Sequence, residues 1–469
     1  LRLYYSSATV AKSTDDIDKI KMHLQELAKK PKGVSEALLI QCARLAGAMA
    51  DTTLKATLRK SLDKTNPKNI LVQEEAFAAY GKLSALEDMI KSEEAFVAKY
   101  GIADNNRNYI NQMNSTIAGK YAEKEDWENV RKYVYQIPDP MIQARDCNEH
   151  AWTLSGGSTD KDGSHYDIAD DLSATSLKLL SSKPPKPASM TQAEWDFNLE
   201  YNKSQYGDTY ALIRFKEGHV DDAIDHQLFA VQETEYQQPD LNERYAIYLE
   251  AAGQKADLKT FLDKVIVIGK ASPRMMDIHK NLWTKESTSD ELYAQYLKQL
   301  DDKAHQLLED KVQKMWKDDE SVPFTLNDLD GKTVSLSDYK GKTVVVDFWA
   351  TWCGPCKASF PGMKQVVEHY ASDKNVVFLF VDTWERQGEI ESRVSGFLKD
   401  NNYPFHVLLD NQNEVIGKYK VDGIPTKFII GPDQKVHFVS VGFGGSTDEL
   451  VEEMKIMIDL TKTGGVVRS

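Results

Sequence analysis

Two cysteines separated by two residues, Cys353 and Cys356, are the side chains of this sequence best suited to covalent chemistry. They lie in the pentapeptide Trp-Cys-Gly-Pro-Cys, directly after an apolar, β-branched run at 344–349 that predicts a strand. The residues that follow predict a helix. On a first helical turn the two sulfurs come within bonding distance, and the unpaired N–H groups and the helix dipole stabilise a thiolate. The pattern therefore indicates reversible thiol–disulfide exchange.

The two sulfurs have different expected roles. Cys353, at the mouth of the helix, is the predicted nucleophile because its lowered thiol pKa leaves a thiolate fraction near neutral pH. Cys356 is the predicted resolving thiol, which attacks the mixed disulfide that Cys353 forms with its target. We expect protein or peptide disulfides as substrates, an external thiol as electron donor, and no cofactor besides the redox-active disulfide.

Half of a zinc site is the main alternative use of such a motif, and it requires a second pair of ligands. The other cysteines, Cys42 and Cys147, are isolated in segments that predict helices, and no His-x₃-His pair occurs. We therefore expect no metal, and we expect both isolated cysteines to be small apolar residues in helices, with a redox partnership as the alternative. A purely structural disulfide is disfavoured, because closing so short a ring removes little unfolded-state entropy.

Asp347 interrupts the predicted strand at 344–349. Burying a carboxylate there is costly unless the chemistry needs it. Desolvation raises the pKa of such a group, so that it can take the proton from Cys356 during the resolving step. The alternative is that Asp347 faces solvent at a sheet edge.

Ile424 and Pro425 precede a second predicted strand, at 426–430. Proline is tolerated at the start of a strand. The residues alone favour an ordinary trans peptide at Pro425.

Five stretches carry motifs that together are far more specific than the cysteine pair. They are Pro-Phe-Thr-Leu at 323–326, Asp-Gly-Lys at 330–332, Leu-Ser-Asp-Tyr-Lys-Gly-Lys at 336–342, Asp-Phe-Trp-Ala-Thr-Trp-Cys-Gly-Pro-Cys at 347–356 and Gly-Ile-Pro-Thr at 423–426. With them, residues from about 321 to 463 resemble the thioredoxin-like domain of the TlpA/ResA group of envelope thiol-disulfide oxidoreductases.

This resemblance implies a thioredoxin fold with an added N-terminal hairpin and a helix–strand insertion at roughly 385–409. It implies a cis peptide at Pro425, packed beside the cysteine pair, and pairing of the Ile424 backbone with an extended substrate. It also implies a bacterial periplasm or cell-envelope location, with lipid anchoring through a segment not present here. Substrate contacts are expected at Trp352, Gly354, Pro355, Ile424 and Pro425.

The Gly354-Pro355 dipeptide matches reducing thioredoxins and favours reduction over oxidation of protein disulfides. Two positions depart from the pattern: Ser359 replaces a glutamate found in some members, and Phe378 replaces a lysine that many thioredoxins place near the buried aspartate. We therefore expect Asp347 to handle the proton without that lysine, in an apolar neighbourhood that raises its pKa further.

Residues 1–315 predict helices. The clearest repeat, at 206–267, is a pair of helical hairpins whose turn glycines, Gly218 and Gly253, are 35 residues apart. This spacing resembles degenerate tetratricopeptide repeats, and an irregular helical bundle is the alternative. A concave face of stacked hairpins would bind a peptide or protein; a spacer or dimerisation element is the alternative role.

The predicted fold class is multidomain, with an all-α N-terminal region and a C-terminal α/β domain. We expect a linker at 316–322, the thioredoxin-like domain at 323–463 and a tail at 464–469. The chain has 469 residues and a net charge of −14, with no basic block, so nucleic acid is excluded as an expected partner. No apolar run reaches the roughly 18 residues of a membrane span, and the start at Leu1 without a leader is consistent with prior processing.

The sequence thus predicts an enzyme, a thiol-disulfide oxidoreductase that reduces protein disulfides. One alternative is a helical-repeat binding adaptor with an accessory redox site. Another is a thiol peroxidase, which is disfavoured because peroxiredoxins place a single peroxidatic cysteine in a Thr-x-x-Cys setting, whereas here a resolving cysteine follows three residues later.

Overall fold

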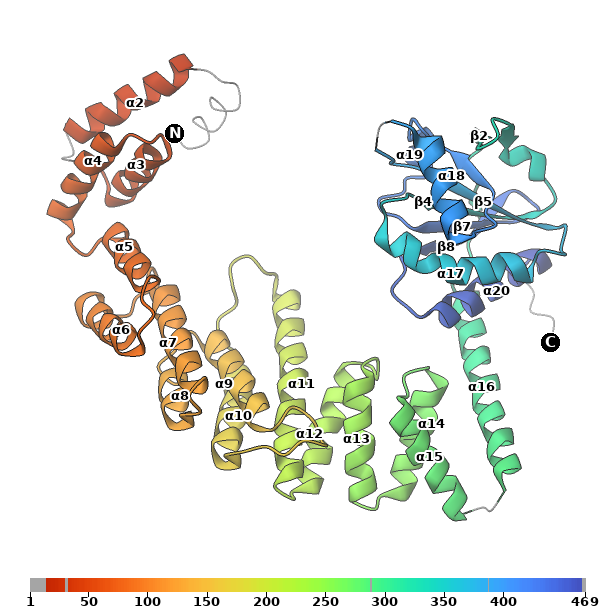
Figure 1. Cartoon of the computed structure of the whole chain (residues 1–469), viewed down its shortest axis with the longest axis horizontal. Coiled ribbons are helices and arrows are strands. Elements are labelled where there is room, and N and C mark those ends of the chain that lie inside the picture. The colour runs from red at the N-terminus through yellow and green to blue at the C-terminus, as the bar shows by residue number, and fades with distance from the viewer. Residues whose placement is uncertain (1–13, 30–32, 287–288, 387, 466–469) are drawn as a thin grey trace. The chain divides into compact units, whose positions relative to one another are not determined.

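The computed structural model describes residues 14–29, 33–286, 289–386 and 388–465 (Figure 1). The chain divides into two compact units, Leu1–Thr288 and Ser289–Ser469. The first is helical and the second is a mixed α/β domain, which confirms the predicted fold class. Of the predicted tail, residues 466–469 lie outside the described part. None of the helices in that part has the length and apolar character that crossing a membrane requires.

The first unit is a succession of helices in which sequence neighbours pack on one another. Its buried side chains form consecutive cores, each drawn from helices close in sequence, as in a stacked array. Its helices are α2 (Thr14–Lys29), α3 (Glu36–Ala48), α4 (Thr52–Thr65), α5 (Ile70–Tyr80), α6 (Leu86–Tyr100), α7 (Arg107–Ala122), α8 (Trp127–Val134), α9 (Pro140–Leu154), α10 (Tyr166–Ser181), α11 (Gln192–Lys216), α12 (Val220–Glu233), α13 (Pro239–Ala251), α14 (Lys255–Val267) and α15 (Pro273–Glu286).

The hairpins predicted at 206–267 correspond to the pairs α11–α12 and α13–α14. Their turns contain Gly218 and Gly253, whose φ angles of +87° and +69° lie in the left-handed region that glycine adopts without strain. Both pairs pack internally, and α12 packs on α13. The predicted helices are therefore present, and the tetratricopeptide resemblance stays a prediction.

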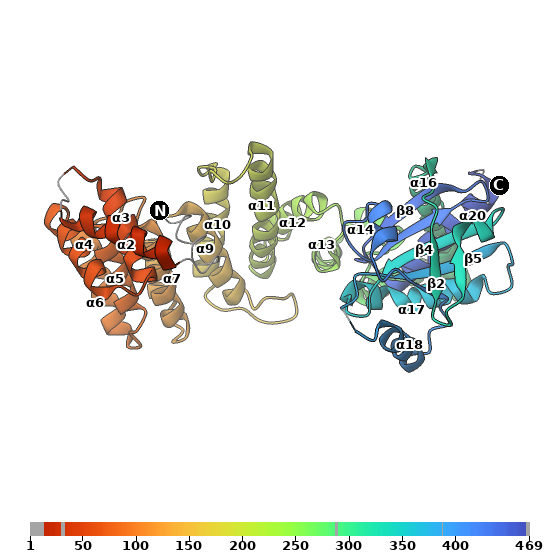
Figure 2. The ribbon, with the colours of Figure 1, turned by 90° about the horizontal axis from the view of Figure 1, so that it is seen from above.

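The second unit is built, over its described residues, on one sheet with the strand order β1-β8-β7-β4-β5-β6-β2-β3. Strands β4 and β5 are parallel and lie side by side in the middle (Figure 2). The strands are β1 (Asp319–Glu320), β2 (Thr325–Asp328), β3 (Thr333–Ser335), β4 (Thr343–Trp349), β5 (Val376–Asp382), β6 (Val407–Leu409), β7 (Thr426–Ile430) and β8 (Lys435–Val441).

Helices cover both faces of this sheet. One face buries side chains of α16, α17, α18 and α20, and the other buries side chains of α19 and the 3₁₀ helix η1. These helices are α16 (Asp290–Gln313), η1 (Leu336–Tyr339), α17 (Gly354–His369), α18 (Ile390–Asn401), α19 (Glu414–Lys418) and α20 (Thr447–Thr463).

The division between the units lies earlier than the linker predicted at 316–322. Helix α16 belongs to the second unit, where it packs on α20. Val312 at its end is fully buried in the same apolar cluster as Cys353 and Cys356. The C-terminal end of α16 therefore belongs to the core of the α/β domain, which its helical periodicity alone did not reveal.

Candidate active site

Cys353 and Cys356 form a disulfide at the point where β4 leads into α17. Cys353 is the N-cap residue of α17, and its sulfur is bonded to that of Cys356 at 1.98 Å, with the two Cα atoms 5.3 Å apart. The backbone N–H of Cys356 donates to the sulfur of Cys353 at 3.1 Å. The structure thus brings the sulfurs together at the helix mouth, where N–H groups and the helix dipole favour negative charge on Cys353.

The backbone at Ile424 and Pro425 lies against this disulfide. The peptide between them is cis, and the carbonyl oxygen of Ile424 is 3.6 Å from the sulfur of Cys353. Strand β7 begins at the next residue, and the N–H of Gly442 donates to the carbonyl of Pro425 at 2.7 Å. The cis peptide agrees with the family resemblance, whereas the residues alone favoured trans.

The surface beside the sulfurs is formed by residues that the sequence predicts to contact substrate. Cys353 itself is only 3% exposed, whereas Trp352 is 48% exposed and Gly354 and Pro355 are exposed. The indole N–H of Trp352 donates to the carbonyl of Trp384 at 2.9 Å, which fixes the ring beside Cys353. These exposed residues therefore border the buried sulfur of Cys353.

Asp347 is 1% exposed, in a strand whose seven residues are all buried. The alternative that it faces solvent is wrong. Strand alternation places it on the sheet face of Val345 and Trp349, which pack in one apolar cluster with Cys353 and Cys356. Burial raises the pKa of the Asp347 carboxyl to about 6. The pKa of Asp347 therefore lies close to neutral pH, where a proton-transfer group is most effective.

A lysine that the sequence analysis did not identify lies opposite Asp347. Lys427 of β7 pairs in register with Asp347 of β4, and its side chain is fully buried. Its Nζ atom is 3.4 Å from a carboxylate oxygen of Asp347. The positive charge lowers the pKa of the carboxyl, against the larger effect of burial. Neither side chain has a hydrogen-bond partner besides the other within the described residues, so each charge is compensated chiefly by the other.

The expectation that Asp347 lacks a lysine partner is therefore wrong, whereas the raised pKa is confirmed. Phe378 of β5 pairs with Val345, not with Asp347, and the cation comes from β7 on the other side of β4. The sequence did carry a signal for this pair. Lys427 interrupts one apolar strand as Asp347 interrupts another, and two opposite charges in buried strands compensate each other only when they are paired.

Ser359, Cys42 and Cys147, which the sequence analysis also considered, contribute to the structure of the fold. The buried hydroxyl of Ser359 donates to the carbonyl of Cys356 at 2.8 Å, so it supports the first turns of α17. Cys42 and Cys147 are buried, and burial raises the pKa of both thiols, that of Cys147 to about 12. They are neutral core thiols. Within the described residues, no cluster of three or more His, Cys, Asp or Glu side chains is arranged to hold a metal.

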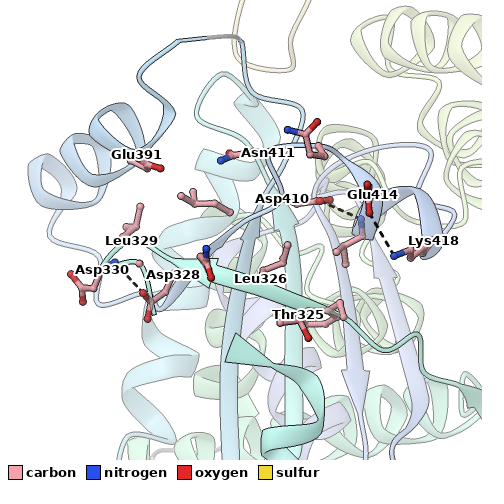
Figure 3. A pocket seen from close by; sticks show the side chains of 16 residues that line it. Thr325, Leu326, Asp328, Leu329, Asp330, Glu391, Asp410, Asn411, Glu414 and Lys418 are labelled. Atoms are coloured by element: carbon pink, nitrogen blue, oxygen red, sulfur yellow. Dashed lines mark hydrogen bonds and ion pairs between the residues drawn. The ribbon is translucent and has the colours of Figure 1, made fainter. Parts of the chain in front are cut away.

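A separate hollow of about 620 Å³ lies beside the β2 strand and α19 (Figure 3). Carboxylates line it, among them Asp328 and Asp410. The Asp410 carboxylate accepts hydrogen bonds from the backbone N–H groups of Val415 and Ile416, so it caps the start of α19. No lining residue belongs to the cysteine motif or to the cis-proline loop. This hollow is distinct from the redox centre.

Thiol-disulfide oxidoreductase ResA of Bacillus subtilis (strain 168) is 37% identical to this chain over 142 residues, which make up 30% of this chain and 75% of that protein. The chain belongs to the ResA family of thiol-disulfide oxidoreductases. Another ResA, from Bacillus thuringiensis subsp. konkukian (strain 97-27), is 36% identical over 143 residues, 30% of this chain and 79% of that protein. The profile described as the AhpC/TSA family matches residues 318–439.

Among solved structures, a thioredoxin-family thiol:disulfide interchange protein from Chlorobium tepidum TLS is 27% identical to this chain. The likeness covers 30% of this chain and 97% of that protein, with a TM-score of 0.27. Membership of the ResA family makes this chain an enzyme of thiol–disulfide exchange, with Cys353 and Cys356 as its cysteine pair.

Proposed function

We propose that this ResA-family domain reduces disulfides of protein or peptide substrates. The observation that carries the proposal is the position of the Cys353 sulfur, bonded to Cys356 at the N-terminus of α17 and adjacent to the Ile424 carbonyl. The Gly354-Pro355 dipeptide between the cysteines supports the reducing direction, because it is the dipeptide of reducing thioredoxins. Location in the bacterial envelope is part of the proposal and rests on the same resemblance.

In the first step the Cys353 thiolate of the reduced enzyme attacks one sulfur of a substrate disulfide. The substrate S–S bond breaks as the bond to Cys353 forms, and the other substrate sulfur leaves as a thiolate that takes a proton from solvent. The N–H groups at the start of α17 stabilise the negative charge on Cys353 before the attack. The product of this step is a mixed disulfide.

In the second step the Cys356 sulfur attacks Cys353. Its thiol proton passes to the Asp347 carboxylate, the Cys353–Cys356 bond forms, and the second substrate sulfur leaves as a thiolate. Two electrons move from the enzyme dithiol to the substrate. The pair with Lys427 favours the charged form of Asp347, which is the form able to accept a proton. A dithiol donor must then reduce the enzyme disulfide before the next turnover.

The match to the AhpC/TSA family profile makes thiol peroxidase the alternative function to consider. A Thr-x-x-Cys peroxidatic motif would need threonine at position 350, where this chain has alanine. Cys353 is instead bonded to a partner three residues away. These two features favour disulfide reduction over peroxide reduction.

Reduction potential decides the direction of electron flow, so it tests the proposal. We expect titration of the full chain against glutathione redox buffers, read by thiol alkylation of Cys353 and Cys356, to give a value of about −200 mV or below. Each 30 mV corresponds to about 1.4 kcal/mol for a two-electron couple. A value near the strongly oxidising figure of about −120 mV would assign the opposite direction.

A further inference from the structure

The loop that carries Cys353 is held by a second loop, at 383–385, which follows β5. Three hydrogen bonds join the two loops. The N–H of Thr383 donates to the Trp349 carbonyl at 2.9 Å, the N–H of Thr351 donates to the Glu385 carboxylate, and the Trp352 indole donates to the loop at the carbonyl of residue 384. The last two bonds hold the residues just before Cys353.

The Glu385 side chain is the ionic member of this contact. Its carboxylate is 3% exposed, and its second oxygen accepts a hydrogen bond from Arg393 of α18 at 2.9 Å. Arg393 also donates to the carbonyls of Arg386 and Gly388, so one guanidinium holds both the carboxylate and the backbone after it. A buried carboxylate with these two partners is costly to retain unless its position matters.

The backbone of the 383–385 loop is itself held in a strained conformation. Trp384 has φ of +53°, in the left-handed region that bulky residues rarely adopt. The Asn413 side chain accepts hydrogen bonds from the Trp384 N–H at 2.7 Å and from the Thr383 hydroxyl at 3.1 Å. Strain maintained by specific contacts next to a reacting group is typical of a functional loop.

Asp382, the last residue of β5, is a second buried acid at this position. It is 1% exposed, and burial, together with the neighbouring carboxylates of Glu385 and Asp410, raises its pKa to about 8, against the opposing effect of Arg393. Asp382 is therefore protonated near neutral pH, and Glu385 is the acid with which Arg393 forms an ion pair. The position of Glu385 depends on Arg393, because a buried carboxylate without its charge partner is costly.

We propose that Glu385, held by Arg393, is a positioning residue that fixes the 350–352 loop and so keeps Cys353 at the helix mouth, where its thiolate is stabilised. This inference rests on the proposed function. Loss of the carboxylate frees the Thr351 N–H and loosens the turn in which the Cys353 N–H donates to the Ala350 carbonyl at 3.1 Å. Cys353 then loses part of its alignment with the N–H groups of α17.

The test uses the full chain in its reduced form and follows alkylation of Cys353 by iodoacetamide from pH 5 to 9, with peptide mass spectrometry to identify the site. We expect Glu385→Ala to shift the profile to higher pH and to slow alkylation at pH 6 about tenfold, as expected for the loss of one charge-assisted hydrogen bond. Glu385→Gln keeps an acceptor for the Thr351 N–H and is expected to shift less.

Lys462→Met is the matched control. Lys462 is about as exposed as Arg393 and makes an ion pair with Asp373, beyond the other end of α17. Its loss is expected to leave the Cys353 profile unchanged. Arg393→Met keeps the Glu385 carboxylate and removes its ion-pair partner, so it is expected to shift the alkylation profile of Cys353 to higher pH as well. If Glu385→Ala does not fold, Arg393→Met provides the test of the positioning role.

The outcomes separate this inference from the proposed function. An ordinary thiol profile for Cys353 in the wild-type chain would contradict the proposed function. A shifted wild-type profile that is unchanged in folded Glu385→Ala and Arg393→Met, or that moves equally in Lys462→Met, would overturn the positioning role alone.

Discussion

Replacement of Cys353 by serine is expected to reduce the rate of disulfide reduction by a factor on the order of 10³ or more, to that of the uncatalysed reaction. A hydroxyl has no accessible ionised form near neutral pH, so the attack on substrate sulfur is lost, whatever binding remains. The measurement is reduction of insulin disulfides by the full chain with a dithiol donor, at matched protein concentrations.

The other two cysteines provide the control for this experiment. Cys42→Ala and Cys147→Ala each remove a buried thiol whose pKa is raised by burial, so both variants are expected to retain wild-type turnover. If Cys353→Ser were to retain full activity, or if Cys147→Ala were to lose it while remaining folded, the reacting thiol would lie elsewhere.

Replacement of both members of the buried ion pair, Asp347→Leu with Lys427→Met, is expected to separate stability from chemistry. The double variant removes two buried charges and leaves apolar side chains of similar size. Such exchanges are neutral or stabilising by about 1–4 kcal/mol, whereas breaking a pair on one side costs about 3–5 kcal/mol. Hydrogen–deuterium exchange of β4 and β7 peptides in the full chain measures this difference between the double variant and Asp347→Leu.

The same double variant is expected to resolve the mixed disulfide about 10²–10³-fold more slowly, because it has no base for the Cys356 proton. In the wild-type chain the resolving rate should fall as pH drops through about 6, since protonated Asp347 accepts no proton. Lys427→Met alone removes the charge that lowers the pKa of Asp347. In this variant the fall in the resolving rate should therefore begin at higher pH.

Stopped-flow measurement of mixed-disulfide decay against pH gives these rates directly. Lys435→Met, at a partly exposed position on β8, is the control for loss of a lysine. It should leave the pH dependence of the resolving rate unchanged. A double variant that resolves at the wild-type rate would remove Asp347 from the mechanism. If the resolving rate of Lys427→Met falls at the same pH as that of the wild type, the ion pair between Asp347 and Lys427 does not set the pKa of Asp347.

The cysteine pair and its setting were predictable because they depend on short-range signals. A β-branched strand, a two-residue spacing and a helix are all read from neighbouring residues, and the position of Asp347 within an apolar run indicated its burial. The cis peptide at Pro425 required the family resemblance, since local preference favours trans.

The partner of Asp347 was not predicted because strand register is a long-range property. Lys427 lies 80 residues further along the chain than Asp347, and only the antiparallel pairing of β4 with β7 places them opposite each other. The same reason explains the misplaced domain boundary. The helical period of residues 290–313 predicts a helix but not the unit whose core the end of that helix joins.

The central claim is that Cys353 receives the substrate sulfur, and trapping tests it most directly. The full-length Cys356→Ser variant, reduced and mixed with a peptide disulfide, lacks the resolving thiol and should accumulate a mixed disulfide. Mass spectrometry of proteolytic fragments is predicted to place one peptide adduct on Cys353. Absence of that adduct, or its appearance on Cys42 or Cys147 instead, would contradict the account.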